Sequence, residues 1–218
     1  MKVIITGVTG MVGEGVMLVC LDHPEVTEVL TISRRTSGHT HSKLKELLID
    51  DFSKIHQYRN QLSEYDACFF CAGVSSVGET EESFTKKTCD FVVPFAEFLA
   101  EIQPKMVFTY VSGTGTDSTE KGKTMWARVK GRTENAVAKL GFRGVYNFRP
   151  GMMKPMKGQR NLNFIYKVAG ATYPIWSIIF PKWTCTLQEV GLAMIHCVIR
   201  GYPSTILEVV DMKKQALR

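Results

Sequence analysis

Short apolar runs alternate with longer amphipathic stretches along the first 151 residues of the chain. The apolar runs are rich in β-branched and aromatic residues and predict strands at 3–5, 28–33, 45–50, 66–71, 106–112 and 145–148. The stretches between them predict helices at 11–21, 54–62, 83–101 and 125–140. Alternating strands and helices are typical of βαβ units, so the sequence predicts an α/β fold with a doubly wound parallel sheet.

The pattern loses its regularity after Gly151. Residues 152–183 are rich in Met, Lys, Pro and aromatic residues, and 186–199 and 206–210 then predict a helix and a short strand. No low-complexity linker or internal repeat divides the chain. We therefore expect a single domain over 1–218.

This domain has two parts, a core at 1–151 and a small C-terminal substrate or lid portion at 152–218. The second part contains the aromatic segment 173–183 (YPIWSIIFPKW). Three roles remain open for that segment: it closes over a site or packs in the core, it contacts a second subunit of a homodimer, or it rests on a membrane interface.

The composition excludes several classes of protein. The 218 residues are 44% hydrophobic and 22% charged, as in an ordinary globular domain. No apolar run approaches the roughly 20 residues of a transmembrane segment, and the apolar stretch at the start is too short for a signal peptide. Six cysteines are too few for a disulfide scaffold. We therefore expect a reduced, cytoplasmic protein.

The net charge of +6 is unevenly distributed. Residues 1–117 carry 10 Lys and Arg against 16 Asp and Glu (−6), whereas 118–218 carry 17 against 5 (+12). The C-terminal half is therefore expected to face something anionic, such as a nucleotide, a phosphorylated substrate or a membrane surface. The cations at 121–139 flank a predicted amphipathic helix without a platform of aromatic residues on which successive bases could stack, so no nucleic acid partner is expected.

A glycine-rich turn follows the first strand and opens the first helix. Gly7 permits the turn, Gly10 allows the backbone to approach a pyrophosphate, and Gly13 allows the helix and the strand to pack closely. The helix N-terminus adds unpaired N–H groups and a partial positive charge. The residues expected to bind the diphosphate of a dinucleotide are Thr6, Gly7, Thr9, Gly10, Met11, Val12 and Gly13.

The second strand ends in Ser33-Arg34-Arg35, where an NAD-binding protein usually carries Asp or Glu. A guanidinium group matches the geometry of a 2′-phosphate. The sequence therefore predicts a preference for NADP(H) over NAD(H), with Ser33, Arg34 and Arg35 beside the adenosine ribose. The alternative is a solvated basic loop.

With these motifs the chain resembles the extended and atypical short-chain dehydrogenase/reductase superfamily, and within it the Tat-interacting-protein-like, epimerase/dehydratase-like branch. The shared segments are TGVTGMVG, ISRR, DDF at 50–52, CAG at 71–73, VSG at 111–113, VKG at 129–131 and RPG at 149–151. The resemblance implies a Rossmann-type fold. It also implies an oxidoreductase or epimerase-like enzyme that acts on a small carbonyl or hydroxyl substrate.

The resemblance also implies roles for individual residues. Ser112, with Thr114, would polarise a substrate carbonyl, and Lys130 would hold the nicotinamide ribose and lower the pKa of a catalytic tyrosine. Further cofactor contacts are expected from Asp51, Phe52, Cys71, Ala72, Gly73, Pro150 and Gly151.

One position departs from the family pattern. The related proteins carry Tyr-x-x-x-Lys, so that the two side chains lie one helical turn apart. Here Trp126 stands four residues before Lys130. An indole N–H only donates hydrogen bonds and cannot replace a phenol as an acid or base. Either the chemistry uses another group, or the protein is a nonenzymatic NADP(H)-binding regulator or partner-binding module.

Four cations follow the sixth predicted strand, where such folds build their substrate wall. We expect Arg149, Lys154, Lys157 and Arg160 to hold an anionic substrate group or the rim of the cofactor phosphates. No metal site is expected. Cys68 and Cys71 are expected on one strand, pointing to opposite faces, and the histidines lack ligand spacing apart from His39 and His41 in a solvated loop.

Overall fold

The computed structural model describes residues 1–162 and 164–218 and is built around a seven-stranded parallel sheet. Its strand order is β3-β2-β1-β4-β5-β6-β9. The strands are β1 (Lys2–Thr6), β2 (Glu28–Ser33), β3 (Leu44–Leu48), β4 (Ala67–Phe70), β5 (Val107–Val111), β6 (Gly144–Arg149) and β9 (Ile206–Glu208). The predicted doubly wound sheet is confirmed. Its order reverses between β1 and β4, the place where such sheets bind ligands.

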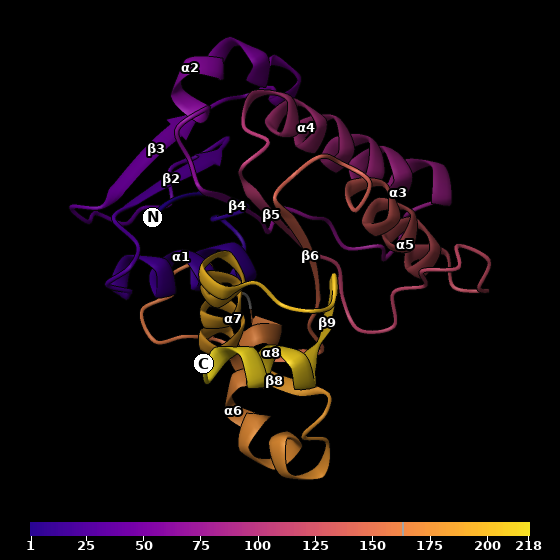
Figure 1. Cartoon of the computed structure of the whole chain (residues 1–218). Coiled ribbons are helices and arrows are strands. Elements are labelled where there is room, and N and C mark those ends of the chain that lie inside the picture. Colours follow the sequence, from indigo (N-terminus) through magenta and orange to yellow (C-terminus); the bar gives the residue numbers. More distant parts are fainter. Residues whose placement is uncertain (163) are drawn as a thin grey trace.

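Helices cover both faces of this sheet (Figure 1). One face is covered by α1 (Met11–Asp22), α7 (Leu187–Arg200) and α8 (Val209–Ala216). The other is covered by η1 (Phe52–Tyr58), α2 (Arg59–Leu62), α4 (Cys89–Ile102) and α5 (Met125–Val137).

Alternate strand residues supply the two cores. In β1, Val3 and Ile5 pack on the side of α1, whereas Ile4 packs on the side of α4. In the same way Cys68 is buried on the α4 side and Cys71 packs on the α1 side. The two thiols therefore point to opposite faces, as predicted from the pleat of a strand. Among the described residues, no group of three His, Cys, Asp or Glu could hold a metal ion.

The long helix predicted at 83–101 is in fact two helices, α3 (Glu81–Lys87) and α4. They are separated at Thr88, whose φ of −122° and ψ of −78° are not helical. The Thr80 hydroxyl caps α3 by accepting a hydrogen bond from the Ser83 backbone N–H. The hydrophobic pattern continues across Thr88, which is itself buried, and so the break was not visible in the sequence.

The C-terminal part differs more from the prediction. The final strand, expected at 206–210, ends at Glu208, because the Glu208 and Asp211 side chains form a capping box that starts α8. A second, small sheet pairs β7 (Met152–Lys154) with β8 (Thr184–Thr186).

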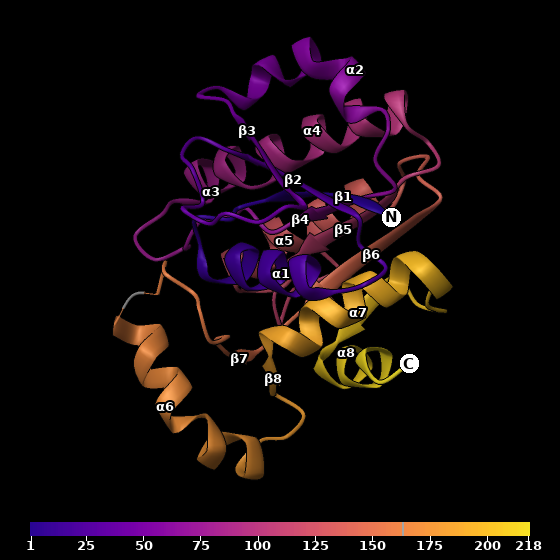
Figure 2. The same ribbon diagram turned by 90° about the vertical axis from the view of Figure 1, so that its left-hand side faces the viewer.

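The unpredicted helix α6 (Phe164–Ile179) lies between β7 and β8 in the chain. Figures 1 and 2 show that it projects away from the layered core. Across the described part of the chain, no helix is long and apolar enough to cross a bilayer.

Candidate functional site

The turn after β1 is packed too tightly for side chains at two of its glycines. Gly7 has a φ of +73°, and a Cβ added there would lie 2.6 Å from the Ala72 backbone nitrogen. A Cβ on Gly13 would lie 2.3 Å from the Gly7 carbonyl oxygen. Gly10 starts α1 and has more room, with only the Gly7 oxygen, at 3.4 Å, near an added Cβ. The turn thus holds its backbone against β4 and leaves the start of α1 open to a ligand.

A cavity of about 890 Å³ opens at the carboxyl ends of β1, β2 and β4; we call it the first cavity. It brings together ten of the residues predicted to bind a dinucleotide. They are Gly7, Thr9, Gly10, Ser33, Arg34, Asp51, Phe52, Cys71, Ala72 and Gly73.

The other residues predicted around this turn do not line the cavity: Thr6, Met11, Val12, Gly13 and Arg35. Thr6 is buried, and its hydroxyl oxygen accepts a hydrogen bond of 3.2 Å from the Ala72 N–H. Gly13 acts by letting α1 approach the turn. These two residues position the walls of the cavity, whereas Arg35 is exposed beside it.

Sequence reasoning missed the far wall of the first cavity, which comes from α3 and α4. Phe91 lies there and packs edge-on against Phe52, with 5.1 Å between ring centroids. The only signal in the sequence was the amphipathic pattern of the helix, which does not say that its end overhangs the sheet. The wall residues are Lys86, Lys87, Asp90, Phe91, Pro94, Phe95 and Phe98.

The charged side chains of the first cavity differ in whether they have hydrogen-bond or ion-pair partners in the protein. Arg34 is exposed and forms no ion pair with any described residue. Asp51 accepts hydrogen bonds from the side chain and the backbone N–H of Ser53, at 2.7 and 2.9 Å, and these bonds lower its pKa. The guanidinium of Arg34 is therefore free to meet an anion.

A second cavity of about 450 Å³ adjoins the first, since Val74 lines both. It contains the four residues predicted to be catalytic, Ser112, Thr114, Lys130 and Trp126, and the expected cofactor contacts Pro150 and Gly151. The remaining lining comes from Val74, Ser75, Ser76, Phe84, Gly113, Met152 and Trp183. No tyrosine is among these residues.

Lys130 is enclosed in the wall of the second cavity. Its Nζ donates a hydrogen bond to the Ser112 carbonyl oxygen. Burial lowers the pKa of Lys130 from 10.5 to about 8, although the Glu134 carboxylate acts in the opposite direction. Lys130 therefore releases its proton more readily than an exposed lysine does.

The Ser112 hydroxyl, which is predicted to polarise a substrate carbonyl, is engaged within the protein. It is buried and lies 2.5 Å from Glu134 Oε1 and 3.1 Å from the Phe148 carbonyl oxygen, both acceptors. A hydroxyl has one proton to donate, so none remains for a substrate carbonyl. Thr114 likewise donates to the Arg149 carbonyl oxygen at 2.9 Å.

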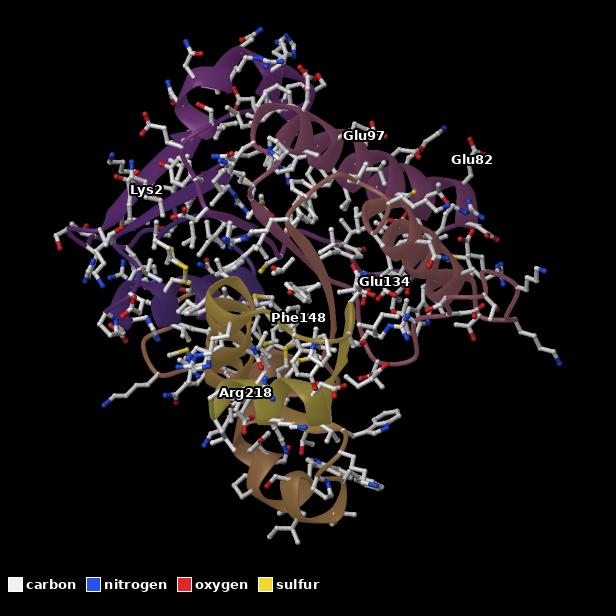
Figure 3. All side chains as sticks on the ribbon, viewed as in Figure 1. Lys2, Glu82, Glu97, Glu134, Phe148 and Arg218 are labelled. Carbon is white, nitrogen blue, oxygen red and sulfur yellow. The ribbon has the colours of Figure 1, made fainter. Side chains whose placement is uncertain are left out.

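Glu134 organises this wall and was missed from the sequence. It points from α5 toward β6 (Figure 3) and binds Arg149 through Oε1 and Oε2, at 3.0 and 2.5 Å. The signal that could have found it is its position, one helical turn after Lys130 on the same face of α5. Ser112, Glu134 and Arg149 form one buried, fully paired network.

The predicted cationic substrate wall is not formed, because none of its four members lines either cavity. Arg149 is buried in ion pairs with Glu134 and Glu208. Lys154 lies over the Tyr173 ring, with 5.6 Å between Nζ and the ring centroid. The other two, Lys157 and Arg160, are exposed, and Arg160 donates to the Gly38 carbonyl oxygen.

Comparisons with known proteins show what the chain is similar to. The model of the NAD dependent epimerase/dehydratase family matches residues 3–143. "Protein fmp52-1, mitochondrial" from Aspergillus terreus is 31% identical over 92% of this chain and 88% of its own. "Protein fmp52, mitochondrial" from Emericella nidulans is 27% identical over the same shares.

Two solved structures illustrate the shared fold. A UDP-glucuronic acid 4-epimerase from Bacillus cereus in complex with NAD has a TM-score of 0.68 at 10% identity, over 97% of this chain and 80% of the other. The enzyme WbmH from Bordetella bronchiseptica in complex with NAD+ has a TM-score of 0.63 at 14% identity, over 91% of this chain and 72% of the other.

The relatives correct one expectation. The composition predicted a cytoplasmic protein, but the similar fungal proteins carry names that assign them to mitochondria. A low cysteine content excludes a disulfide scaffold and does not distinguish one reducing compartment from another.

Proposed function

Because this chain belongs to the NAD dependent epimerase/dehydratase family, we propose that it binds NADP(H) and acts on a small carbonyl or hydroxyl substrate. The observation that carries the proposal is the glycine cradle joined to a second cavity that contains Lys130. The residues fit a dinucleotide: Gly7 and Gly13 exclude side chains from the turn, and Gly10 leaves the helix N-terminus accessible to a diphosphate.

The preference for NADP(H) over NAD(H) rests on Arg34. Its exposed guanidinium lines the first cavity at the end of β2, without an ion pair to any described residue. A 2′-phosphate placed there would gain a charge-assisted hydrogen bond that a 2′-hydroxyl cannot supply. The adenine would lie beside Asp51 and Phe52, which line the same cavity.

The proton in the reaction is assigned to Lys130. A bound nicotinamide coenzyme would supply hydride transfer. Below pH 8 the Lys130 ammonium carries a proton at Nζ, and its lowered pKa makes release of that proton to a substrate oxygen easier than from an ordinary lysine. Trp126 Nε1 can only donate a hydrogen bond, so it would orient a substrate oxygen without exchanging a proton.

Titration of the purified chain with NADPH and NADH tests the first half of the proposal. We expect NADPH to bind at least about tenfold more tightly, from a charge-assisted contact worth roughly 1.5 kcal/mol or more. Absence of binding by either reduced coenzyme at millimolar concentration would remove the proposed function. A screen of carbonyl compounds that follows NADPH absorbance then tests the second half, with Lys130→Met as the variant expected to lose turnover.

A second function is favoured by two observations on the second cavity. Trp126 replaces the phenol of the family pattern, and the Ser112 proton is held by Glu134 and the Phe148 carbonyl. Both suit a protein that binds NADP(H) and regulates a partner without turnover. Trp126→Tyr separates the two: activity that appears only in this variant favours the regulator, whereas turnover of the wild type that Lys130→Met abolishes favours the enzyme.

A further inference from the structure

The segment from Phe164 to Trp183 exposes an unusual amount of apolar side chain; we call it the apolar arm. It consists of α6 and the short connection to β8, and Figure 2 shows it standing clear of the core. Ile178 is 81% exposed and Phe164 79%. Further exposed apolar side chains of the arm are Val168, Ile175, Trp176, Ile179, Phe180 and Trp183.

Four of the exposed apolar side chains of α6 form one stripe. Phe164, Val168, Ile175 and Ile178 recur at spacings of four, seven and three residues, which places them on one face of a helix. The opposite face meets the protein. There an added Cβ on Gly170 would lie 3.2 Å from Pro155 Cδ.

This orientation is the reverse of that in an ordinary surface helix, which turns its apolar stripe toward the core. The side of α6 near the protein also carries Tyr173, on whose ring Lys154 rests. The apolar stripe therefore lacks a partner among the described residues, and exposure of this much contiguous apolar surface is typical of an interaction site.

The charges around the arm select the kind of partner. From Gly151 to Gln188 the chain has five Lys and Arg and no Asp or Glu. Lys157, Lys167 and Lys182 are exposed, and none of them pairs with a described acidic residue. Lys213 of α8 reaches the arm and donates to the Pro181 carbonyl oxygen at 2.8 Å. An apolar stripe accompanied by cations, in a segment without acidic residues, is the pattern of a helix that lies in the interface of an anionic membrane.

A second copy of the chain fits less well. Residues 118–218 carry a net charge of +12 (17 against 5), so a homodimer through the arm would bring two strongly basic regions together. The aromatic residues also favour a membrane over a second copy of the chain. Trp176 and Phe180 stack with ring centroids 5.9 Å apart near the end of the arm, and tryptophan favours the boundary between lipid and water.

We propose that the apolar arm docks on anionic lipid, with the stripe of α6 in the outer acyl region and the lysines at the headgroups. α6 lies along the surface, since no described helix could span the bilayer. Trp183 belongs both to the arm and to the lining of the second cavity, so the docked surface reaches the rim of the proposed active site. The docking itself does not depend on the coenzyme.

Co-sedimentation of the full chain with lipid vesicles tests the proposal. We expect binding to vesicles of phosphatidylcholine mixed with phosphatidylglycerol, and at least about tenfold weaker binding to phosphatidylcholine alone. The double variant Ile175→Ser with Ile178→Ser removes two exposed isoleucines from the stripe and should weaken binding by about tenfold or more. Tryptophan fluorescence should shift to the blue on mixed vesicles in the wild type and much less in this variant.

A matched control replaces exposed apolar residues elsewhere, Leu48→Ser with Val210→Ser, and should bind vesicles as the wild type does. Circular dichroism of both double variants checks that they fold. No binding to anionic vesicles, or equal loss in the control, overturns the proposal. So does a concentration-dependent dimer in solution that the arm variant dissociates, because the stripe would then be covered by a second copy.

Discussion

The two adjoining cavities are built in different ways. One side of the first is shaped by backbone geometry: a glycine turn held against β4, and Gly10 at the N-terminus of α1, where an added Cβ would have only the Gly7 oxygen within 4 Å. The second is shaped by side chains that are bound to one another, with Ser112 and Arg149 held by Glu134. The first cavity keeps the Arg34 guanidinium available to a ligand, whereas in the second the Ser112 and Thr114 hydroxyls and Lys130 Nζ all donate hydrogen bonds within the protein.

This difference explains why the cavities relate so differently to the family pattern. A dinucleotide cradle depends on a few glycines, and those are present at the required positions. A catalytic site depends on which protons and lone pairs are still free. In the second cavity the nominal serine donor is engaged, and Lys130, with its lowered pKa, becomes the chief titratable group.

The largest expected effect comes from breaking the network of the second cavity. Arg149→Met leaves the buried Glu134 carboxylate without its ion-pair partner, so the free energy of unfolding should fall by about 3–5 kcal/mol. Denaturant unfolding measures this. NADPH affinity should stay unchanged, because Arg149 lines neither cavity. Arg132→Met, which removes an exposed pair with Glu120 at 3.4 Å, is the control and should cost less than about 1 kcal/mol.

A smaller effect is expected from disturbing the first cavity. Gly13→Ala places a Cβ 2.3 Å from the Gly7 oxygen, and the forced shift should cost about 2 kcal/mol of stability and most of the NADPH affinity. Fluorescence titration and denaturant unfolding measure the two losses. In Gly141→Ala the added Cβ has no atom within 4 Å, and both quantities should be retained. Unchanged NADPH binding in Gly13→Ala would contradict the cradle.

A still smaller effect, on coenzyme affinity alone, is expected from removing the Arg34 guanidinium from the first cavity. Arg34→Ala should weaken NADPH binding by about tenfold, the value of one lost charge-assisted hydrogen bond of roughly 1.5 kcal/mol, and leave NADH binding unchanged. Arg35→Ala is the matched control, since Arg35 lies outside the first cavity. An equal loss for both coenzymes would assign Arg34 to the diphosphate rather than to the 2′-phosphate.

The last expected effect, which is small over any single pH unit, is a pH dependence due to Lys130. The pKa of Lys130 is about 8 in the folded protein and 10.5 in the unfolded chain. Between these two pH values the amino group therefore binds more protons in the unfolded chain than in the folded protein. Stability supplied by this group therefore rises with pH from about 8 to 10.5, by less than about 1.4 kcal/mol per pH unit. Lys130→Met should remove that slope in unfolding curves, whereas the exposed Lys182→Met should keep it. The same slope in both variants would show that Lys130 is not desolvated.

The sequence was most informative where one local rule determines the structure. The strands β2 and β6 and the helix α1 were predicted within one residue at each end, because the hydrophobic pattern is continuous there and polar residues or glycines bound it. It was least informative where two elements meet. The break at Thr88 and the helix α6 depend on packing and capping that the hydrophobic pattern does not encode.

Taken by itself, the chain determined the parallel sheet, the glycine cradle and the replacement of the expected tyrosine by Trp126, since each is a matter of residue type at a given spacing. Only the tertiary structure decided that Arg149 pairs with Glu134 and that the Ser112 hydroxyl donates its hydrogen bond within the protein. Hydrogen-bond partners that lie far apart in the sequence become known only when the strands and helices are placed. It also decided that the stripe of α6 faces outward. Periodicity shows that a helix has an apolar side, and the neighbouring elements settle whether that side is covered.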